Sequence, residues 1–167
     1  KVPGLNPRGL YLAEDAAGIV PLCRWDLSHE ELVLGTAPIR FSMFLDNIDA
    51  FDTEMFSLSK NEASIIDPQH RNLLECAFES LANMDSLSDM VSSGVFVGIA
   101  STEYRKVVHD HINGYSPLSA TGTLSISVAA GRVSFTFGFQ GPAVPVETAC
   151  SSSLVALHTS ANSINLG

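Results

Sequence analysis

The sequence predicts an α/β fold in which parallel strands alternate with helices. Residues 94–100 and 141–148 are short, apolar segments that begin at a glycine, as is typical of buried strands. Helical patterns occupy residues 65–84, 123–136 and 151–166. Strands that alternate with helices in this order indicate a layered α/β arrangement with parallel strands.

The most regular helical pattern follows an irregular N-terminal region, residues 1–57, in which Pro, Gly and Asp separate short apolar pieces. Asp67 is a good N-cap for this helix, and Pro68 suits its first position. One apolar face then follows, formed by Leu73, Leu74, Ala77, Phe78 and Leu81. A second, shorter helix is expected at residues 102–110.

The helices on either side of the second strand differ in composition. Residues 123–136 centre on VAAGRVSF, whose small side chains allow close packing. Residues 151–166 begin with three serines, and Gly167 is well placed to end that helix. The last helix therefore starts directly after the strand that precedes it.

Composition limits the classes of protein that the chain can represent. Its 167 residues suit one domain or a piece of a larger one, and 46% hydrophobic residues with 16% charged residues are enough to build a core. A formal charge of −9 disfavours nucleic acid and anionic membrane surfaces as partners. No apolar run is long enough to cross a bilayer.

The N-terminus and the cysteines indicate the compartment. The first residues, KVPGLNPRGLYLAED, lack the parts of a signal peptide and an initiating Met, which predicts a sequence excised from a longer chain. Cys23, Cys76 and Cys150 are too few and too scattered for a disulfide framework or a zinc site. We therefore expect a reducing, cytoplasmic location. Cys76 is expected to be a small core residue, and Cys23 gives no clear signal.

Cys150 is the candidate nucleophile, because it lies where a strand ends and a helix begins. The unpaired N–H groups and the positive dipole end of a helix N-terminus stabilise a thiolate. Ligands of open α/β sheets bind outside the carboxyl ends of the strands, where this turn would lie. The alternative is a structural cysteine in a tight turn, and placement alone does not separate the two interpretations.

None of the five histidines is a convincing partner for Cys150. His158 lies eight residues along the same helix, which is about 12 Å, whereas a general base must come within about 3 Å. It is four residues from Leu154, so a core or supporting histidine is the preferred interpretation. His109 and His111 form an isolated H-x-H that we do not expect to bind metal. His29 and His70 are predicted to lie on the surface.

ETACSSSLVALH, residues 147–158, resembles the active-site signature of β-ketoacyl synthases, specifically the ketosynthase domains of polyketide synthases and of type I fatty acid synthases. Further stretches resemble the family in the same order. They are CRWD at 23–26, FLDNIDAFDTEMF at 44–56, SKNEASIIDPQHRNLLECAFE at 59–79, SGVFVGIASTEY at 93–104 and VAAGRVSFTFGFQGPAVPVETACSSS at 128–153. Several motifs in the right order make this resemblance highly specific, and it favours Cys150 as the nucleophile.

The sequence departs from the family pattern at two positions. Glu147 replaces the usual Asp before TAC, and His70 replaces the usual second Gln of DPQQR. Neither change removes a reacting group. The resemblance also implies that the opening strand of the family and everything after Gly167 lie outside this sequence. In the family, the part after Gly167 includes two catalytic histidines and the loop that supplies the second N–H group of the oxyanion hole.

The resemblance implies a thiolase-like fold with αβαβα layers, of which residues 1–167 are most of the N-terminal half. The implied reaction begins when Cys150 attacks an acyl thioester carried on the phosphopantetheine of an acyl carrier protein, with the Cys150 N–H helping to hold the oxyanion. A malonyl-type extender then condenses with loss of carbon dioxide. The family needs no metal or redox cofactor and is homodimeric, with residues 121–132 expected near the dimer contact. The isolated chain is expected to be inactive.

Two other classes of protein remain open. One is a non-condensing homologue that sets chain length or decarboxylates, but such proteins commonly replace the cysteine with Gln. The other is an interaction domain in which Cys150 is inert. Between a polyketide and a fatty acid synthase, the DPQHR and CSSSLVALH neighbourhoods favour polyketide.

Overall fold

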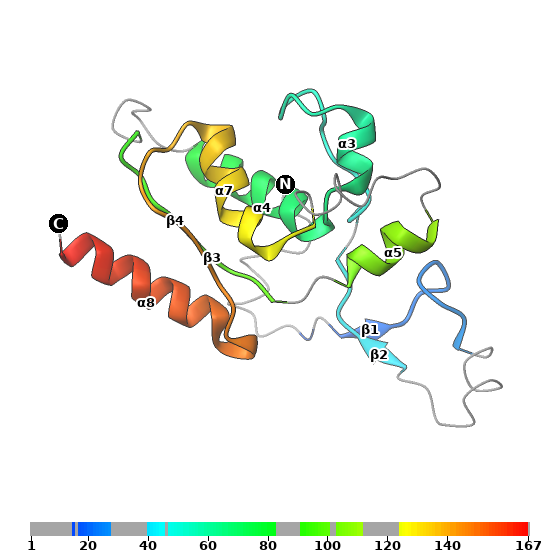
Figure 1. Cartoon of the computed structure of the whole chain (residues 1–167). Helices are drawn as coiled ribbons and strands as arrows, with labels where there is room; N and C mark the ends of the chain where they lie inside the picture. The colour runs from blue at the N-terminus through cyan, green and yellow to red at the C-terminus, as the bar shows by residue number, and fades with distance from the viewer. Residues whose placement is uncertain are drawn as a thin grey trace. The chain divides into compact units, whose positions relative to one another are not determined.

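The computed structural model describes residues 15, 17–27, 40–45, 47–82, 91–100, 103–111 and 124–166 (Figure 1). The chain separates into two compact units, Lys1–Ile48 and Asp49–Gly167. Each unit has its own short sheet. Cys150 belongs to the second unit.

The first unit contains two very short strands. β1 (Gly18–Ile19) pairs with β2 (Phe41–Ser42) in antiparallel orientation. Next to them, the Arg24 guanidinium lies 5.8 Å from the centre of the Phe44 ring, and the Trp25 ring meets the same ring edge-on at 5.7 Å. Arg24 and Trp25 of the CRWD stretch therefore both pack against one aromatic side chain, in a region where the sequence predicted irregular structure.

The second unit opens with two helices. α3 (Lys60–Ile65) was not anticipated; the Ser59 hydroxyl caps it by accepting a hydrogen bond from the Glu62 N–H at 3.1 Å. α4 (Pro68–Leu81) confirms the predicted helix start, because the Asp67 carboxylate accepts a hydrogen bond from the Gln69 N–H at 2.8 Å.

The two predicted buried strands pair in parallel, as the sequence predicted. β3 (Val95–Gly98) lies beside β4 (Ala143–Val146), with Val95 opposite Ala143. Both strands are shorter than the predicted segments. The ladder continues one residue further, where the Ile99 N–H donates to the Val146 carbonyl at 3.1 Å.

The predicted helices between and after these strands are also present, with shifted ends. They are α5 (Tyr104–His111), α7 (Ile126–Phe137) and α8 (Ser152–Asn165). Gly138 ends α7 with φ of 72°, a left-handed conformation that glycine adopts without strain. Gly167, the predicted end of α8, lies outside the described residues.

The second unit has three layers, in which α8 lies along one face of the β3–β4 pair while α7 and α4 lie on the other (Figure 1). Side chains alternate along β3. Val95, Val97 and Ile99 point into the core beneath α7 and α4. The buried core consists of Phe56, Leu74, Val95, Val97, Ile99, Ala129, Ala130 and Val133. The layering agrees with the predicted α/β fold class.

The predicted surface position of His70 is wrong. The residue is 2% exposed and stands one helical turn before Leu74, so it shares the face of α4 that packs into the core. Burial lowers the pKa of His70, Asp67 acts to raise it, and Arg132 acts to lower it. The apolar pattern of the helix gave no sign that its buried face begins with a histidine. His29 lies outside the described residues.

Candidate active site

Cys150 lies between strand and helix, as predicted. β4 ends at Val146, and a 3₁₀ turn, η2 (Ala149–Ser151), leads into α8 at Ser152. Cys150 is an exposed free cysteine in the middle of this turn. The sequence pattern located the junction correctly but not the 3₁₀ turn that precedes the α-helix.

Backbone strain and two serine hydroxyls define the turn around Cys150. Ala149 has φ of 52°, a left-handed conformation that costs a residue with a Cβ free energy. The Ser152 hydroxyl donates to the Ala149 carbonyl and accepts from the Thr148 N–H, both at 2.8 Å. The Ser151 hydroxyl lies 2.8 Å from the Thr148 carbonyl and 2.9 Å from the Thr148 hydroxyl. These hydrogen bonds hold a strained backbone in place.

Gly98 allows β3 to approach this turn closely. A Cβ at position 98 would lie 2.5 Å from the Ser153 nitrogen and 2.6 Å from the Ser152 carbonyl carbon, which is closer than real Cβ atoms come. Both contacts are with backbone, which cannot rotate away. The end of β3 therefore packs directly against the backbone of the first turn of α8. The sequence did not predict this role for Gly98. A glycine at the end of a buried strand was the available signal.

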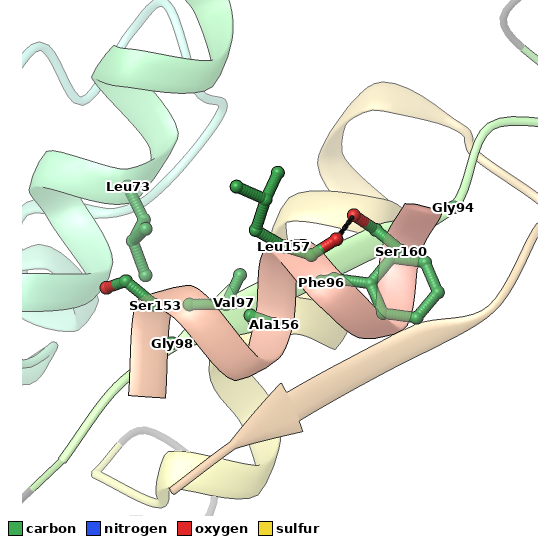
Figure 2. Close-up of a pocket in the computed structure, with 9 residues that line it drawn as sticks. All are labelled: Leu73, Gly94, Phe96, Val97, Gly98, Ser153, Ala156, Leu157 and Ser160. Atoms are coloured by element: carbon green, nitrogen blue, oxygen red, sulfur yellow. Dashed lines mark hydrogen bonds between the residues drawn. The ribbon is translucent and has the colours of Figure 1, made fainter. Parts of the chain in front are cut away.

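A groove of about 480 Å³ runs beside the turn, between β3 and α8 (Figure 2). Its lining residues are Leu73, Gly94, Phe96, Val97, Gly98, Ser153, Ala156, Leu157 and Ser160. Figure 2 shows Ser153, Ala156, Leu157 and Ser160 along one side of α8, with Leu73 coming from α4. Cys150 is not among the lining residues of this groove.

The structure does not bring a described histidine into a partnership with Cys150. His158 is exposed, so its predicted core position is wrong, and its Nε2 lies 3.0 Å from the Asn162 amide nitrogen on the same helix. His109 is also exposed, and its Nδ1 lies 3.1 Å from the Asp110 carboxylate. The side chain of His111 lies outside the described residues. Spacing along the chain remains the argument against His158 as a base.

The other two cysteines differ from Cys150. Cys76 is half-buried on α4, and burial raises the pKa of its thiol, with Glu79 and Glu75 adding to the effect. A raised pKa leaves less thiolate, which is the reactive form. Cys23 is exposed in the first unit. Cys150 alone among the three stands at a strand-to-helix turn.

The described part of the chain contains neither a metal centre nor a membrane span. In that part of the chain, no three His, Cys, Asp or Glu side chains come together where they could hold a metal ion. No helix in it is both long and apolar enough to cross a membrane. Of the segment expected near a dimer contact, residues 121–123 are not described. Arg132 lies on α7, with its Nη1 3.5 Å from the Glu62 carboxylate.

Comparison with known proteins identifies the class to which this fold and turn belong. The model of the β-ketoacyl synthase N-terminal domain matches residues 7–167. The chain belongs to this β-ketoacyl synthase family, and the resemblance to polyketide synthase ketosynthases is confirmed.

Individual relatives agree with this assignment. A mycocerosic acid synthase-like polyketide synthase of Mycobacterium tuberculosis is 38% identical over 164 residues, 95% of this chain and 8% of the relative. The spectinabilin polyketide synthase system protein NorC of Streptomyces orinoci is 45% identical over 136 residues, 80% of this chain and 6% of the relative. The chain thus spans less than a tenth of the length of these curated relatives.

Solved structures confirm the predicted thiolase-like ketosynthase fold. An oxazolomycin ketosynthase domain from Streptomyces albus superposes with a TM-score of 0.79 at 32% identity, over 95% of this chain and 29% of that one. A ketosynthase from module 6 of the bacillaene synthase of Bacillus subtilis gives 0.75 at 31% identity, over 95% of this chain and 26% of that one. The chain covers between a quarter and a third of each solved ketosynthase.

Proposed function

We propose that the chain supplies the nucleophile of a polyketide synthase β-ketoacyl synthase, and that Cys150 is this nucleophile. The observation that carries the proposal is an exposed thiol on a hydrogen-bonded turn between strand and helix. Free cysteines are usually buried, whereas a thiol that reacts with a substrate must be reachable. The family membership of residues 7–167 adds support.

In the proposed acylation, the Cys150 sulfur attacks the carbonyl carbon of an acyl thioester on the phosphopantetheine arm of an acyl carrier protein. A carbon–sulfur bond forms to Cys150, the bond to the pantetheine sulfur breaks, and that sulfur leaves as a thiolate that takes up a proton. The carbonyl oxygen carries negative charge between these events. The backbone N–H of Cys150 donates a hydrogen bond to it.

In the proposed condensation, a malonyl-type extender on a carrier protein loses carbon dioxide, and its carbanion attacks the acyl group on Cys150. The bond from the acyl carbon to the Cys150 sulfur breaks and the thiolate is regenerated. The family resemblance assigns two histidines and a second oxyanion donor to sequence beyond Gly167. We therefore expect residues 1–167 alone to give no β-ketoacyl product.

The proposed partners are acyl carrier protein and a second copy of the chain, and no metal or redox cofactor takes part. A free thiol nucleophile needs a reducing compartment, so we place the protein in the cytoplasm. A type I fatty acid synthase is the nearest alternative, and the polyketide synthase names of the relatives favour the polyketide assignment. Cys150 itself argues against a non-condensing homologue.

The proposal is tested by Cys150→Ala in the complete synthase that contains this sequence. Incubation with a radiolabelled acyl thioester, followed by mass spectrometry of peptides, should place the acyl group on Cys150. The variant should lose acylation and condensation altogether. Cys23→Ala is the matched control, because it removes an exposed thiol from the other unit and should leave acylation unchanged. Retained acylation in Cys150→Ala would overturn the assignment.

A further inference from the structure

Ser152 makes an unusual set of hydrogen bonds around Cys150. Its side chain is buried, with the residue 5% exposed, although it stands at the first position of α8. The hydroxyl accepts from the Thr148 N–H and donates to the Ala149 carbonyl, both at 2.8 Å. The Ser152 backbone N–H donates to the same Ala149 carbonyl. Two donors of a single residue therefore converge on one oxygen.

The direction of the Ala149 carbonyl fixes the direction of the Cys150 N–H. Both groups belong to one peptide unit, which is planar and trans, so they point in opposite directions. Holding the carbonyl toward Ser152 turns the Cys150 N–H away from the helix. Ala149 adopts φ of 52°, which a residue with a Cβ rarely adopts, so this orientation depends on the contacts that maintain it.

We propose that Ser152 is a positioning residue that aims the Cys150 N–H at the oxyanion. This inference rests on the proposed function, because it takes the Cys150 N–H as an oxyanion donor. Ser152 touches no reacting atom. Its hydroxyl sets the peptide plane between Ala149 and Cys150, and the close approach of Gly98 to the Ser152 and Ser153 backbone holds the serine in place.

Two reactions of the same thiol separate this role from a general structural one. Acylation by a thioester places negative charge on a carbonyl oxygen, whereas alkylation by iodoacetamide displaces iodide at a saturated carbon and forms no oxyanion. In the complete synthase, Ser152→Ala should slow acylation of Cys150 by about 10- to 100-fold, since losing a whole oxyanion donor costs about 10²–10³-fold. Its rate of alkylation should change by less than about threefold.

Ser163→Ala is the control, because it also removes a hydroxyl that bonds to the backbone of α8, at 3.1 Å from the Thr159 carbonyl. Both rates should stay at the wild-type value in this variant. If Ser152→Ala does not fold, Ser152→Cys keeps the side-chain length with a weaker donor, and it should slow acylation selectively.

The outcomes distinguish this inference from the proposed function. A wild-type protein that is not acylated at Cys150 would overturn the proposed function itself. A wild-type protein that is acylated, together with a Ser152→Ala variant that is acylated at the same rate, would overturn only the role of Ser152. A parallel loss of acylation and alkylation would also overturn it, because that result indicates general disorder of the turn.

Discussion

The two faces of the β3–β4 pair differ in how completely they are covered. On one face, the side chains of Val95 and Val97 in β3, and of Ile99 directly after it, are buried in the core with α4 and α7. On the other, α8 buries Ser152 and Ala156, while Leu154 and Leu157 remain 72% and 66% exposed. The first face contains the hydrophobic core, and the second contains the Cys150 turn.

This difference indicates a division of roles within one small sheet. Burial of large apolar side chains is the main source of folding free energy, so the α4–α7 face supplies most of the stability. The α8 face supplies the close backbone contacts that shape the turn at Cys150. Substitutions on the two faces should therefore separate chemistry from stability when they are made in the complete ketosynthase domain.

The largest effect is expected from Gly98→Ala on the α8 face. The new Cβ would lie 2.5 Å from the Ser153 nitrogen, so the first turn of α8 must shift. Because misplacement of about 1 Å can cost about 10²-fold in rate, we expect acylation of Cys150 to fall by at least that factor. Stopped-flow measurement of acylation per folded molecule tests this.

Gly18→Ala is the matched control for Gly98→Ala. It makes the same change in β1 of the first unit, where a Cβ meets nothing within 4 Å. Acylation should be unchanged, because no neighbouring atom has to move. Normal acylation in Gly98→Ala would show that the close contact does not shape the turn.

An intermediate effect, on stability alone, is expected from Leu74→Ala on the α4–α7 face. Leu74 is fully buried in the core, so its truncation should lower the free energy of unfolding by about 2–5 kcal/mol. Acylation per folded molecule should stay normal. Denaturant unfolding and an acylation assay on the same sample provide the measurement.

Val107→Ala on α5 is the corresponding control, because that side chain is exposed and its loss should cost less than about 0.5 kcal/mol. If Leu74→Ala instead impaired acylation in correctly folded protein, the proposed division between the two faces would fail.

The smallest effect is expected in the pH dependence of stability, through His70 on the α4–α7 face. Burial lowers the pKa of His70 in the folded protein below its unfolded value of about 6.5. Between the two pKa values, the unfolded chain therefore binds more protons than the folded protein does. The stability from neutral His70 is present above pH 6.5 and is lost as the pH falls through the lowered pKa. The slope from one such group is at most about 1.4 kcal/mol per pH unit.

His70→Gln should remove this contribution, since glutamine does not titrate. Unfolding free energies measured from pH 8 down to pH 5 should fall less steeply in the variant than in the wild type. Identical slopes would mean that His70 does not contribute to the pH dependence of folding.

Local patterns in the sequence were enough to predict most elements of the second unit, although not α3 or the 3₁₀ turn η2. Asp67 and Pro68 marked the start of α4, because capping depends on residues within one turn. Short apolar runs predicted β3 and β4, and their alternation with helices predicted parallel pairing. The strand-to-helix junction at Cys150 was predicted for the same reason. Its assignment as the nucleophile came from the family resemblance and remains a proposal.

Other features depend on which surfaces meet in three dimensions, and these the sequence did not reveal. His70 is buried because its face of α4 packs into the core. Histidine as a residue type is found both in the interior and at the surface, so its identity did not predict this. Gly98 and Ser152 lie far apart in the chain, and their contact forms only when β3 lies beneath α8. The sequence by itself determined that Cys150 lies at the junction between a strand and a helix. Tertiary packing decided the direction of the backbone around it, because a strained turn persists only where neighbouring elements hold it.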